Sequence, residues 1–300
     1  DEDQDFIKES IGLQLYLVQK KMEHLKLVEQ SLEEMEQKMD NEEEIDWTQM
    51  MNLLHVTNLE KGLVEQYKNA SNLDIRIGLH QKYSQNPQPW FEWIYEQLNL
   101  KEKDEVLELG CGTGELWKNK NLPKNVHVTL SDQSQGMVKD ARNYVGEGKG
   151  QISYQMIDCR QIPKEDHSFD KVIANHVLFY LDDRQQVFNE IKRVLKQNGT
   201  FICSTYGSSH MQEITQLIKD FDERITLSDH KLYDVFGLEN GEEQLKKVFS
   251  QVKEIDYEDE LLVDQPEPLI SYILSCHGNQ HEYLNHRYLE FKDFVRKKMA

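Results

Sequence analysis

The sequence predicts an α/β domain with a mainly parallel sheet, preceded by a helical extension. A candidate buried strand at 105–109 runs into a glycine turn and then toward a helix. Short apolar segments alternate with helical ones from residue 105 onward, which is typical of parallel α/β sheets. The first 70 residues contain no proline, and their apolar side chains recur at seven-residue intervals.

The N-terminal segment, residues 1–70, is predicted to form a helical hairpin or a coiled coil. The apolar positions that repeat every seven residues are Ile11, Val18, Leu25, Leu32 and Met39. Two interpretations stay open for this seam: a hairpin packed on its own domain, or a dimerisation coil that makes the chain a homodimer. A seam of this length needs an apolar partner, which favours the dimer.

Residues 71–300 are predicted to form the α/β domain. The expected strands are 105–109, 126–131, 152–157, 169–175 and 200–205, and the expected helices between them include 135–145 and 183–195. Residues 251–257 and 260–264 are expected to close the sheet as a hairpin. Residues 71–99 are expected to supply helices that cover a ligand, 207–250 an insertion on the substrate side, and 265–300 a helical tail.

The glycine turn at 110–114 indicates which ligand the strand ends hold. Its spacing is G-x-G-x-G, whereas a dinucleotide site needs a third glycine at position 115, which is Glu. Glu108 stands two residues before the turn, where it would repel a pyrophosphate and attract a cationic ligand. Glycine lets bare N–H groups approach such a ligand closely.

An acid followed by G-x-G-x-G resembles the first motif of class I S-adenosylmethionine (SAM) dependent methyltransferases. The resemblance implies a Rossmann-like, seven-stranded, mainly parallel sheet with SAM as cofactor and S-adenosylhomocysteine as product. It also implies that the turn residues Gly110, Cys111, Gly112 and Gly114 bind the cofactor together with Glu108.

Two further acids follow predicted strands. Asp132 is positioned to accept hydrogen bonds from both hydroxyls of a ribose, although it is also a candidate helix N-cap. The resemblance implies that Gln133 and Met137 continue this site along adenine. It further implies that Asp158 binds the adenine amino group, with Cys159 and Arg160 beside it.

The fourth predicted strand ends at Asn175-His176, the position that faces the transferable methyl and the acceptor. The backbone of Asn175 is expected to meet the cofactor. His176 is a candidate general base, because an unperturbed imidazole titrates near neutral pH, and a structural histidine is the alternative. Arg76 and Tyr83, in the covering helices, are expected at the methionine end of SAM.

Composition excludes several functional classes. The net charge of −19 disfavours nucleic-acid binding by this chain, since phosphate binding depends on Lys and Arg. No apolar run reaches the roughly 18 residues that span a bilayer, so no membrane partner is expected. The four cysteines have no paired spacing, so neither a metal site nor a disulfide framework is expected and the cytoplasm is the expected location.

The sequence therefore predicts a methyltransferase that acts on a small molecule by direct in-line displacement. The four cysteines have no paired spacing, so they give little support to arsenite as the acceptor. The N-terminal segment also resembles the effector-side coiled coil of MerR-type transcription regulators. The alternative function is thus a regulator whose DNA-binding part would lie upstream of Asp1. An NAD(P) oxidoreductase ranks last, because the dinucleotide glycine is missing.

Overall fold

In the computed structural model, the described part of the chain is 72–300 without 147–149, 229–230, 277, 285–286 and 300. The predicted coil at 1–70 lies outside these described residues. None of the helices among them is both long and apolar enough to cross a membrane.

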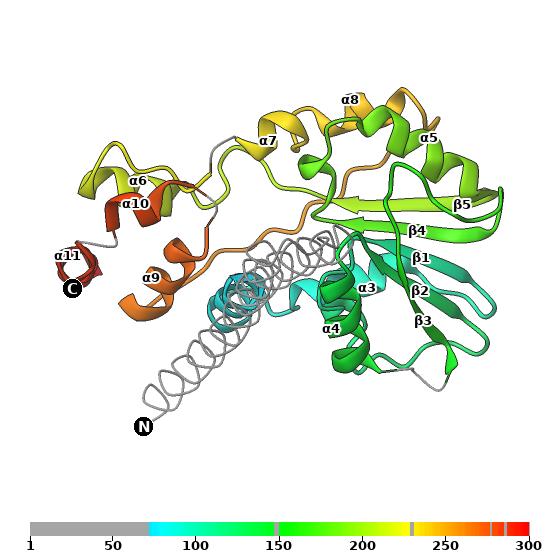
Figure 1. The fold of residues 1–300 in the computed structure, drawn as a ribbon, viewed down its shortest axis with the longest axis horizontal. Coiled ribbons are helices and arrows are strands. Elements are labelled where there is room, and N and C mark those ends of the chain that lie inside the picture. The colour runs from blue at the N-terminus through cyan, green and yellow to red at the C-terminus, as the bar shows by residue number, and fades with distance from the viewer. Residues whose placement is uncertain (1–71, 147–149, 229–230, 277, 285–286, 300) are drawn as a thin grey trace, which may run out of the picture. The chain divides into compact units, whose positions relative to one another are not determined.

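A five-stranded parallel sheet holds the described residues together (Figure 1). Its strands are β1 (Glu105–Leu109), β2 (His127–Asp132), β3 (Ile152–Met156), β4 (Phe169–Asn175) and β5 (Leu195–Ser204). Their order is β3-β2-β1-β4-β5, and every neighbouring pair is parallel. The winding direction therefore reverses between β1 and β4. Ligands of open α/β sheets bind beyond the strand ends at such a reversal.

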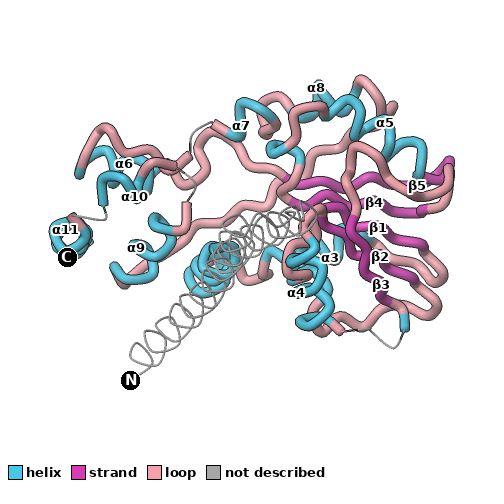
Figure 2. The backbone as a smooth tube through the Cα atoms, viewed as in Figure 1, coloured by secondary structure: helices cyan, strands magenta, loops and turns pink. Residues whose placement is uncertain are grey.

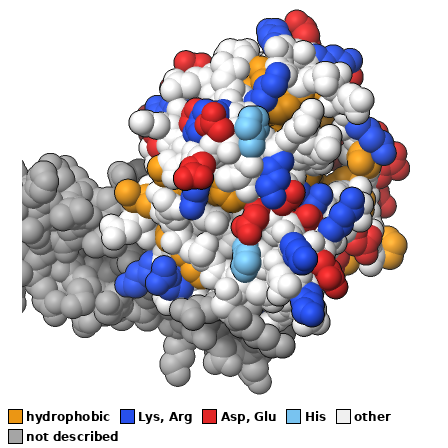
Figure 3. Space-filling view, turned by 90° about the vertical axis from the view of Figure 1, so that its right-hand side faces the viewer, with side chains coloured by type: hydrophobic (Ala, Val, Ile, Leu, Met, Phe, Trp, Pro, Cys, Tyr) orange, Lys and Arg blue, Asp and Glu red, His pale blue; other side chains and the backbone are white. Residues whose placement is uncertain are grey.

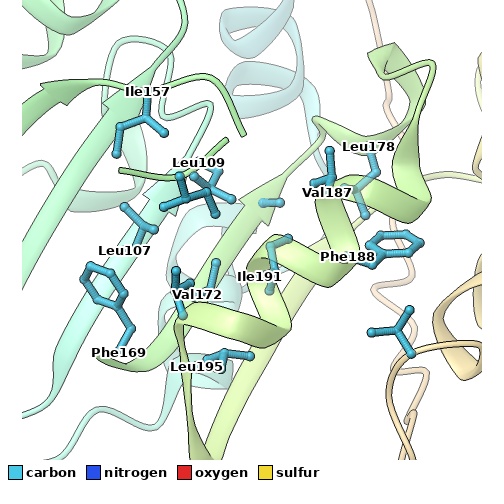
Figure 4. Close-up of a cluster of buried hydrophobic side chains, with 14 of the residues drawn as sticks. Leu107, Leu109, Ile157, Phe169, Val172, Leu178, Val187, Phe188, Ile191 and Leu195 are labelled. Carbon is cyan, nitrogen blue, oxygen red and sulfur yellow. The ribbon is translucent and has the colours of Figure 1, made fainter. Parts of the chain in front are cut away.

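The two faces of the sheet are covered by different helices, because side chains alternate along each strand. Leu107 and Leu109 pack with α5 (Arg184–Val194) in one cluster of buried side chains (Figure 4). Val106 points to the opposite face and packs with α3 (Trp90–Leu98). The helix α4 (Gln135–Val145) contacts β2 and β3 and contributes Val145 to the edge of this second cluster.

The helices that follow β5 form a further apolar cluster of their own. They are α6 (Gln212–Phe221), α9 (Pro266–Leu274), α10 (Gln280–Leu284) and α11 (Tyr288–Met299), which Figure 2 shows apart from the sheet. Leu79 and Tyr83 of the helix at 72–83 are buried in this cluster. The insertion at 207–250 also contains α7 (Leu232–Val235) and α8 (Gly241–Lys246). The helical tail predicted for 265–300 is confirmed.

Three expectations about the fold differ from the structure. The described residues contain five strands rather than seven. The hairpin at 251–264 is absent: its one β-bridge joins Leu261 to Ser84, because five acidic residues between 254 and 260 disfavour strand pairing. The helix expected after the glycine turn is a single 3₁₀ turn, η1 (Glu115–Trp117). Asn119 then takes a left-handed φ of 57°, which ends helical geometry.

One face of the molecule carries charges of both signs side by side. Figure 3 shows Lys and Arg interspersed with Asp and Glu on the side where the strands begin. No continuous basic surface appears on that face. The carboxyl edge of the strands, on the other side, carries the residues that the sequence singles out.

Candidate functional site

The turn after β1 brings three glycines to the carboxyl edge of the sheet. Gly110, Gly112 and Gly114 have φ angles of +71°, +54° and +81°, which side chains other than glycine rarely allow. A Cβ on Gly110 would overlap Val177, which follows β4, and a Cβ on Gly114 would lie 2.7 Å from Val145 of α4. The three positions thus need glycine both for the backbone angle and for close packing.

Asp132, at the end of β2, is tied to this turn. Its carboxylate accepts a hydrogen bond from the N–H of Gly112 at 3.1 Å and from the N–H of Ser134 at 2.8 Å. Burial nevertheless outweighs these bonds and raises its pKa. The N-cap of α4 is Ser134, whose hydroxyl accepts from the N–H of Met137 at 3.2 Å. Asp132 is therefore not the helix cap that the alternative interpretation made it.

Glu108 lies beneath the glycine turn and is 2% exposed. Its carboxylate accepts a hydrogen bond of 2.6 Å from the indole Nε1 of Trp117. Burial raises the pKa of Glu108 to about 7, and the nearby charge of Asp132 adds to the rise. Within the described residues, neither acid forms an ion pair with Lys or Arg. The turn therefore holds two desolvated carboxyl groups without a counter-cation.

The end of β4 presents Asn175 and His176 beside the glycine turn. Asn175 pairs directly with Ser204 of β5. The Ser204 hydroxyl donates to the Asn175 side-chain oxygen and accepts from the backbone N–H of His176 at 3.0 Å. His176 adopts a φ of 55°, an uncommon angle for a residue with a side chain. Ser204 thus fixes the conformation of this turn.

Burial and two neighbouring imidazoles, His210 and His80, lower the pKa of His176 to about 4. Its ring centroid lies 5.3 Å from that of Trp90 in α3 and 6.4 Å from that of Tyr206. His176 is consequently neutral at physiological pH and half-buried among aromatic rings.

Part of the chain matches the model of a known protein family. Residues 107–203 match the family model described as a methyltransferase domain. This range begins within β1, ends within β5 and includes β2, β3 and β4. This stretch of the chain is therefore similar to methyltransferase domains.

The chain is similar to several proteins named as methyltransferases. It is 29% identical over 119 residues to a ubiquinone/menaquinone biosynthesis C-methyltransferase of Desulfotalea psychrophila, which covers 39% of this chain and 47% of that protein. It is 27% identical over 168 residues to phosphoethanolamine N-methyltransferase 1 of Zea mays, covering 56% and 32%. The chain thus spans less than half the length of these relatives.

A solved SAM-dependent methyltransferase from Aquifex aeolicus has a TM-score of 0.37 and 21% identity, over 46% of this chain and 81% of that one.

The residues expected around adenine lie along the edges of β2 and β3. Gln133 is exposed and Met137 is half-buried in the first turn of α4. Asp158 follows β3, but its carboxylate is bound by Arg160, whose terminal nitrogen lies 2.7 Å away. This pairing lowers the pKa of Asp158. Burial raises the pKa of Cys159 to about 11, so its thiol stays protonated.

The helix at 72–83 connects the glycine turn with the region beyond β5. Leu73 would contact a Cβ on Gly112 at 3.1 Å, and the Gln81 amide donates to Glu115 at 3.0 Å. Burial raises the pKa of Tyr206 to about 12 and raises that of Tyr272 as well, and the nearby charge of Arg76, on the same helix, offsets part of each rise. Tyr83 is buried in the helical cluster, and its hydroxyl has no hydrogen-bond partner among the described residues.

Several residues at this site escape sequence reasoning. His80 and His210 stack with ring centroids 5.9 Å apart, although 130 positions separate them in the chain. Ser204 ends a strand, where a serine carries no recognisable signal. Tyr206, His210 and Tyr272 come from separate stretches of the chain, and no local sequence pattern predicts that they meet.

The described residues contain no group of three or more His, Cys, Asp or Glu side chains able to hold a metal ion. The cysteines of the described part are free. Burial raises the pKa of Cys111 far above its usual range, which makes it a packing residue rather than a nucleophile.

Proposed function

We propose that this chain transfers a methyl group from SAM to a small-molecule acceptor. The observation that carries the proposal is the pair of acids at the glycine turn: Glu108, which is buried, and Asp132, which is half-buried. Desolvated carboxyl groups are costly unless a positive charge meets them. SAM carries a sulfonium and an ammonium group, so these two carboxyl groups fit this cofactor better than an anionic dinucleotide.

Each part of the strand-end region has a proposed role toward the cofactor. The turn at Gly110–Gly114, including Cys111 and Gly112, would bind the amino-acid portion through its backbone, with Glu108 beneath it. Asp132 is proposed to bind the ribose, Asn175 to lie near the methyl, and Tyr83 to lie toward the methionine end. The candidates toward adenine are Gln133, Met137, Asp158, Cys159 and Arg160.

The role of Asp158 requires local rearrangement, whereas that of Asp132 does not. The carboxylate of Asp158 is engaged by Arg160, so binding of an adenine amino group there needs Arg160 to turn away. Asp132 keeps its backbone hydrogen bonds and retains further lone pairs for ribose hydroxyls, since each carboxylate oxygen accepts more than one bond.

When bound, SAM would supply a sulfonium methyl group: the acceptor atom bonds to the methyl carbon in line as the carbon–sulfur bond breaks, and S-adenosylhomocysteine leaves. The chain's own contribution is to orient the acceptor and exclude water, and orientation is worth roughly 7–11 kcal/mol in favourable cases. The helix at 72–83 and the aromatic residues of α3 are suited to exclude water. His176, neutral and beside Trp90, is suited to accept a hydrogen bond or a proton from the acceptor.

The weak basicity of His176 favours acceptors that release a proton readily. A base with a pKa of about 4 takes a proton from an ammonium group only at a cost of several kcal/mol. The relatives include a C-methyltransferase and an N-methyltransferase, so both carbon and nitrogen remain candidates for the atom that receives the methyl group.

We also propose a homodimer through residues 1–70 and a cytoplasmic location.

The proposal is tested by calorimetric titration with SAM and S-adenosylhomocysteine, followed by a metabolite screen for SAM-dependent methylated products. We expect binding of both nucleosides and weaker binding of NAD. Failure of the intact chain to bind either SAM or S-adenosylhomocysteine would refute the function.

A further inference from the structure

Among the described residues Arg76 forms no ion pair, whereas most arginines of this acidic chain do. Arg160 pairs with Asp158 at 2.7 Å, and Arg193 and Arg224 likewise contact carboxylates. Arg76 donates from Nε to the carbonyl of Asn72 on its own helix, at 3.2 Å, and forms no ion pair within the described residues. It is half-buried. A half-buried guanidinium without a counter-anion is a candidate anion site.

Hydrogen-bonding rings of this helix and of two other segments, 206–210 and α9, lie around this part of the helix. His80 follows Arg76 by about one helical turn, and its ring lies 5.9 Å from that of His210 and 6.4 Å from that of Tyr272. Tyr206 lies 4.7 Å from His210 by ring centroids. In the part of the chain that the structure describes, no hydrogen bond involves the side chain of any of these four residues.

The charges around these rings favour an anion over a cation. Burial and the nearby His80 lower the pKa of His210 to about 4, although the residue keeps an exposed edge. The imidazoles are thus neutral, and Arg76 supplies the permanent charge. The carboxylate that acts on His80 is Asp259, which already accepts hydrogen bonds from the N–H groups of Gln85 and Asn86.

These groups lie on the acceptor side of the proposed reaction centre. Tyr206 connects them to His176, 6.4 Å away by ring centroids, at the end of β4. The helix at 72–83 contacts the glycine turn through a different residue, Leu73, which lies beside Gly112. Arg76 acts electrostatically on Tyr272 and Cys276, which lie in and just after α9.

We propose that Arg76, His80, His210 and Tyr272 bind an anionic group, a carboxylate or phosphate, of the methyl acceptor. The inference rests on the proposed methyl transfer and adds the class of substrate. Charge-assisted bonds from the guanidinium, together with imidazole N–H and phenol O–H donors, would satisfy the groups that have no partner now. The site offsets the repulsion of an anion by a chain with a net charge of −19.

The same anion chemistry has a second possible source, the methionine carboxylate of the cofactor. Two probes separate the sources. S-Adenosylhomocysteine carries that carboxylate and 5′-methylthioadenosine lacks it. For the acceptor, 4-hydroxyphenylacetate and tyramine share a phenol ring and differ in the sign of the charge.

The experiment titrates both phenols into the full chain saturated with S-adenosylhomocysteine. We expect 4-hydroxyphenylacetate to bind about tenfold more tightly than tyramine, and this preference to disappear in Arg76→Gln and to weaken in His210→Asn. His210 is exposed, so the latter variant tests the site with little risk to folding. Arg142→Gln, an exposed arginine of α4, is the matched control and should keep the preference.

Three outcomes would overturn the assignment. One is equal or tighter binding of tyramine, and another is binding of neither phenol by the saturated chain. The third concerns Arg76→Gln: the variant keeps the phenol preference and its affinity for 5′-methylthioadenosine, but loses affinity for S-adenosylhomocysteine. That result would assign Arg76 to the cofactor. Loss of S-adenosylhomocysteine binding by the unmodified chain would instead refute the proposed function itself.

Discussion

The indole of Trp117 donates a 2.6 Å hydrogen bond to Glu108, so the buried acid of β1 is held from the end of the 3₁₀ turn that follows the glycines. The contact makes the strand, the glycine turn and η1 one unit. It also places a carboxyl group whose pKa is raised to about 7 directly under the proposed cofactor site. The acid is thus poised to change its charge near physiological pH.

Glu108 should make stability depend on pH. Its folded pKa, about 7, exceeds the unfolded value near 4.5, so the stabilising contribution of the protonated form is fully present below pH 4.5 and is lost as the pH rises through 7. A shift of this size corresponds to about 3 kcal/mol. Urea unfolding at pH 5 and pH 8 should show a smaller pH dependence in Glu108→Gln than in the unmodified chain. Glu213→Gln, exposed on α6, should retain the full dependence.

Asp132 should contribute to SAM affinity through its charge. We expect Asp132→Ala to weaken SAM binding by roughly ten- to a hundred-fold, from the loss of about 1.5–3 kcal/mol of charge-assisted hydrogen bonding. Asp132→Asn keeps an acceptor oxygen for the backbone N–H of Gly112. This variant therefore shows the effect of removing the charge while the hydrogen bond to the glycine turn remains. Calorimetry compares both with the exposed Asp182→Ala. Unchanged affinity in both Asp132 variants would contradict the ribose assignment.

His176 should affect turnover more than cofactor binding. We expect His176→Ala to lower kcat by about ten- to a hundred-fold, while the Kd for SAM stays within about twofold of the unmodified chain. Because the pKa of His176 is lowered to about 4, the imidazole stays neutral above pH 6, and kcat should show no inflection from this residue between pH 6 and 9. A rate that is unaltered in His176→Ala would assign the histidine a purely structural role.

The close packing of Gly114 should make it less replaceable than a glycine with open surroundings. Gly114 and Gly150 have φ angles of +81° and +82°, but a Cβ at 114 would lie 2.7 Å from Val145, whereas one at 150 meets nothing within 4 Å. Gly150→Ala should cost about 1–2 kcal/mol of unfolding free energy from the backbone angle alone. Gly114→Ala should cost more in the same denaturation experiment, and equal losses would show that Val145 yields without penalty.

Local sequence patterns were sufficient for the central strands and two helices. β1 and β4 agree with prediction residue for residue, and so does α4, because an apolar run or a helical apolar stripe bounded by turn residues is a local signal. The glycine spacing and the acids at 108, 132 and 158 were likewise readable, since each follows directly from position relative to a strand.

The remaining features depended on distant contacts. The segment at 251–264 has hydrophobic residues suited to a strand, yet its pairing is with Ser84 rather than with the sheet, a choice that no local pattern contains. The bond between Arg160 and Asp158 and that between Ser204 and His176 depend on how separate strand ends meet.

By itself the sequence determined the parallel α/β sheet, the glycine turn and the acids that favour a cationic cofactor, because backbone freedom and side-chain charge are properties of the residues themselves. Only the tertiary structure decided that Glu108 is held by Trp117 and that His80, His176 and His210 share one electrostatic environment. Burial and the meeting of distant segments set those pKa values, and neither exists before the chain folds.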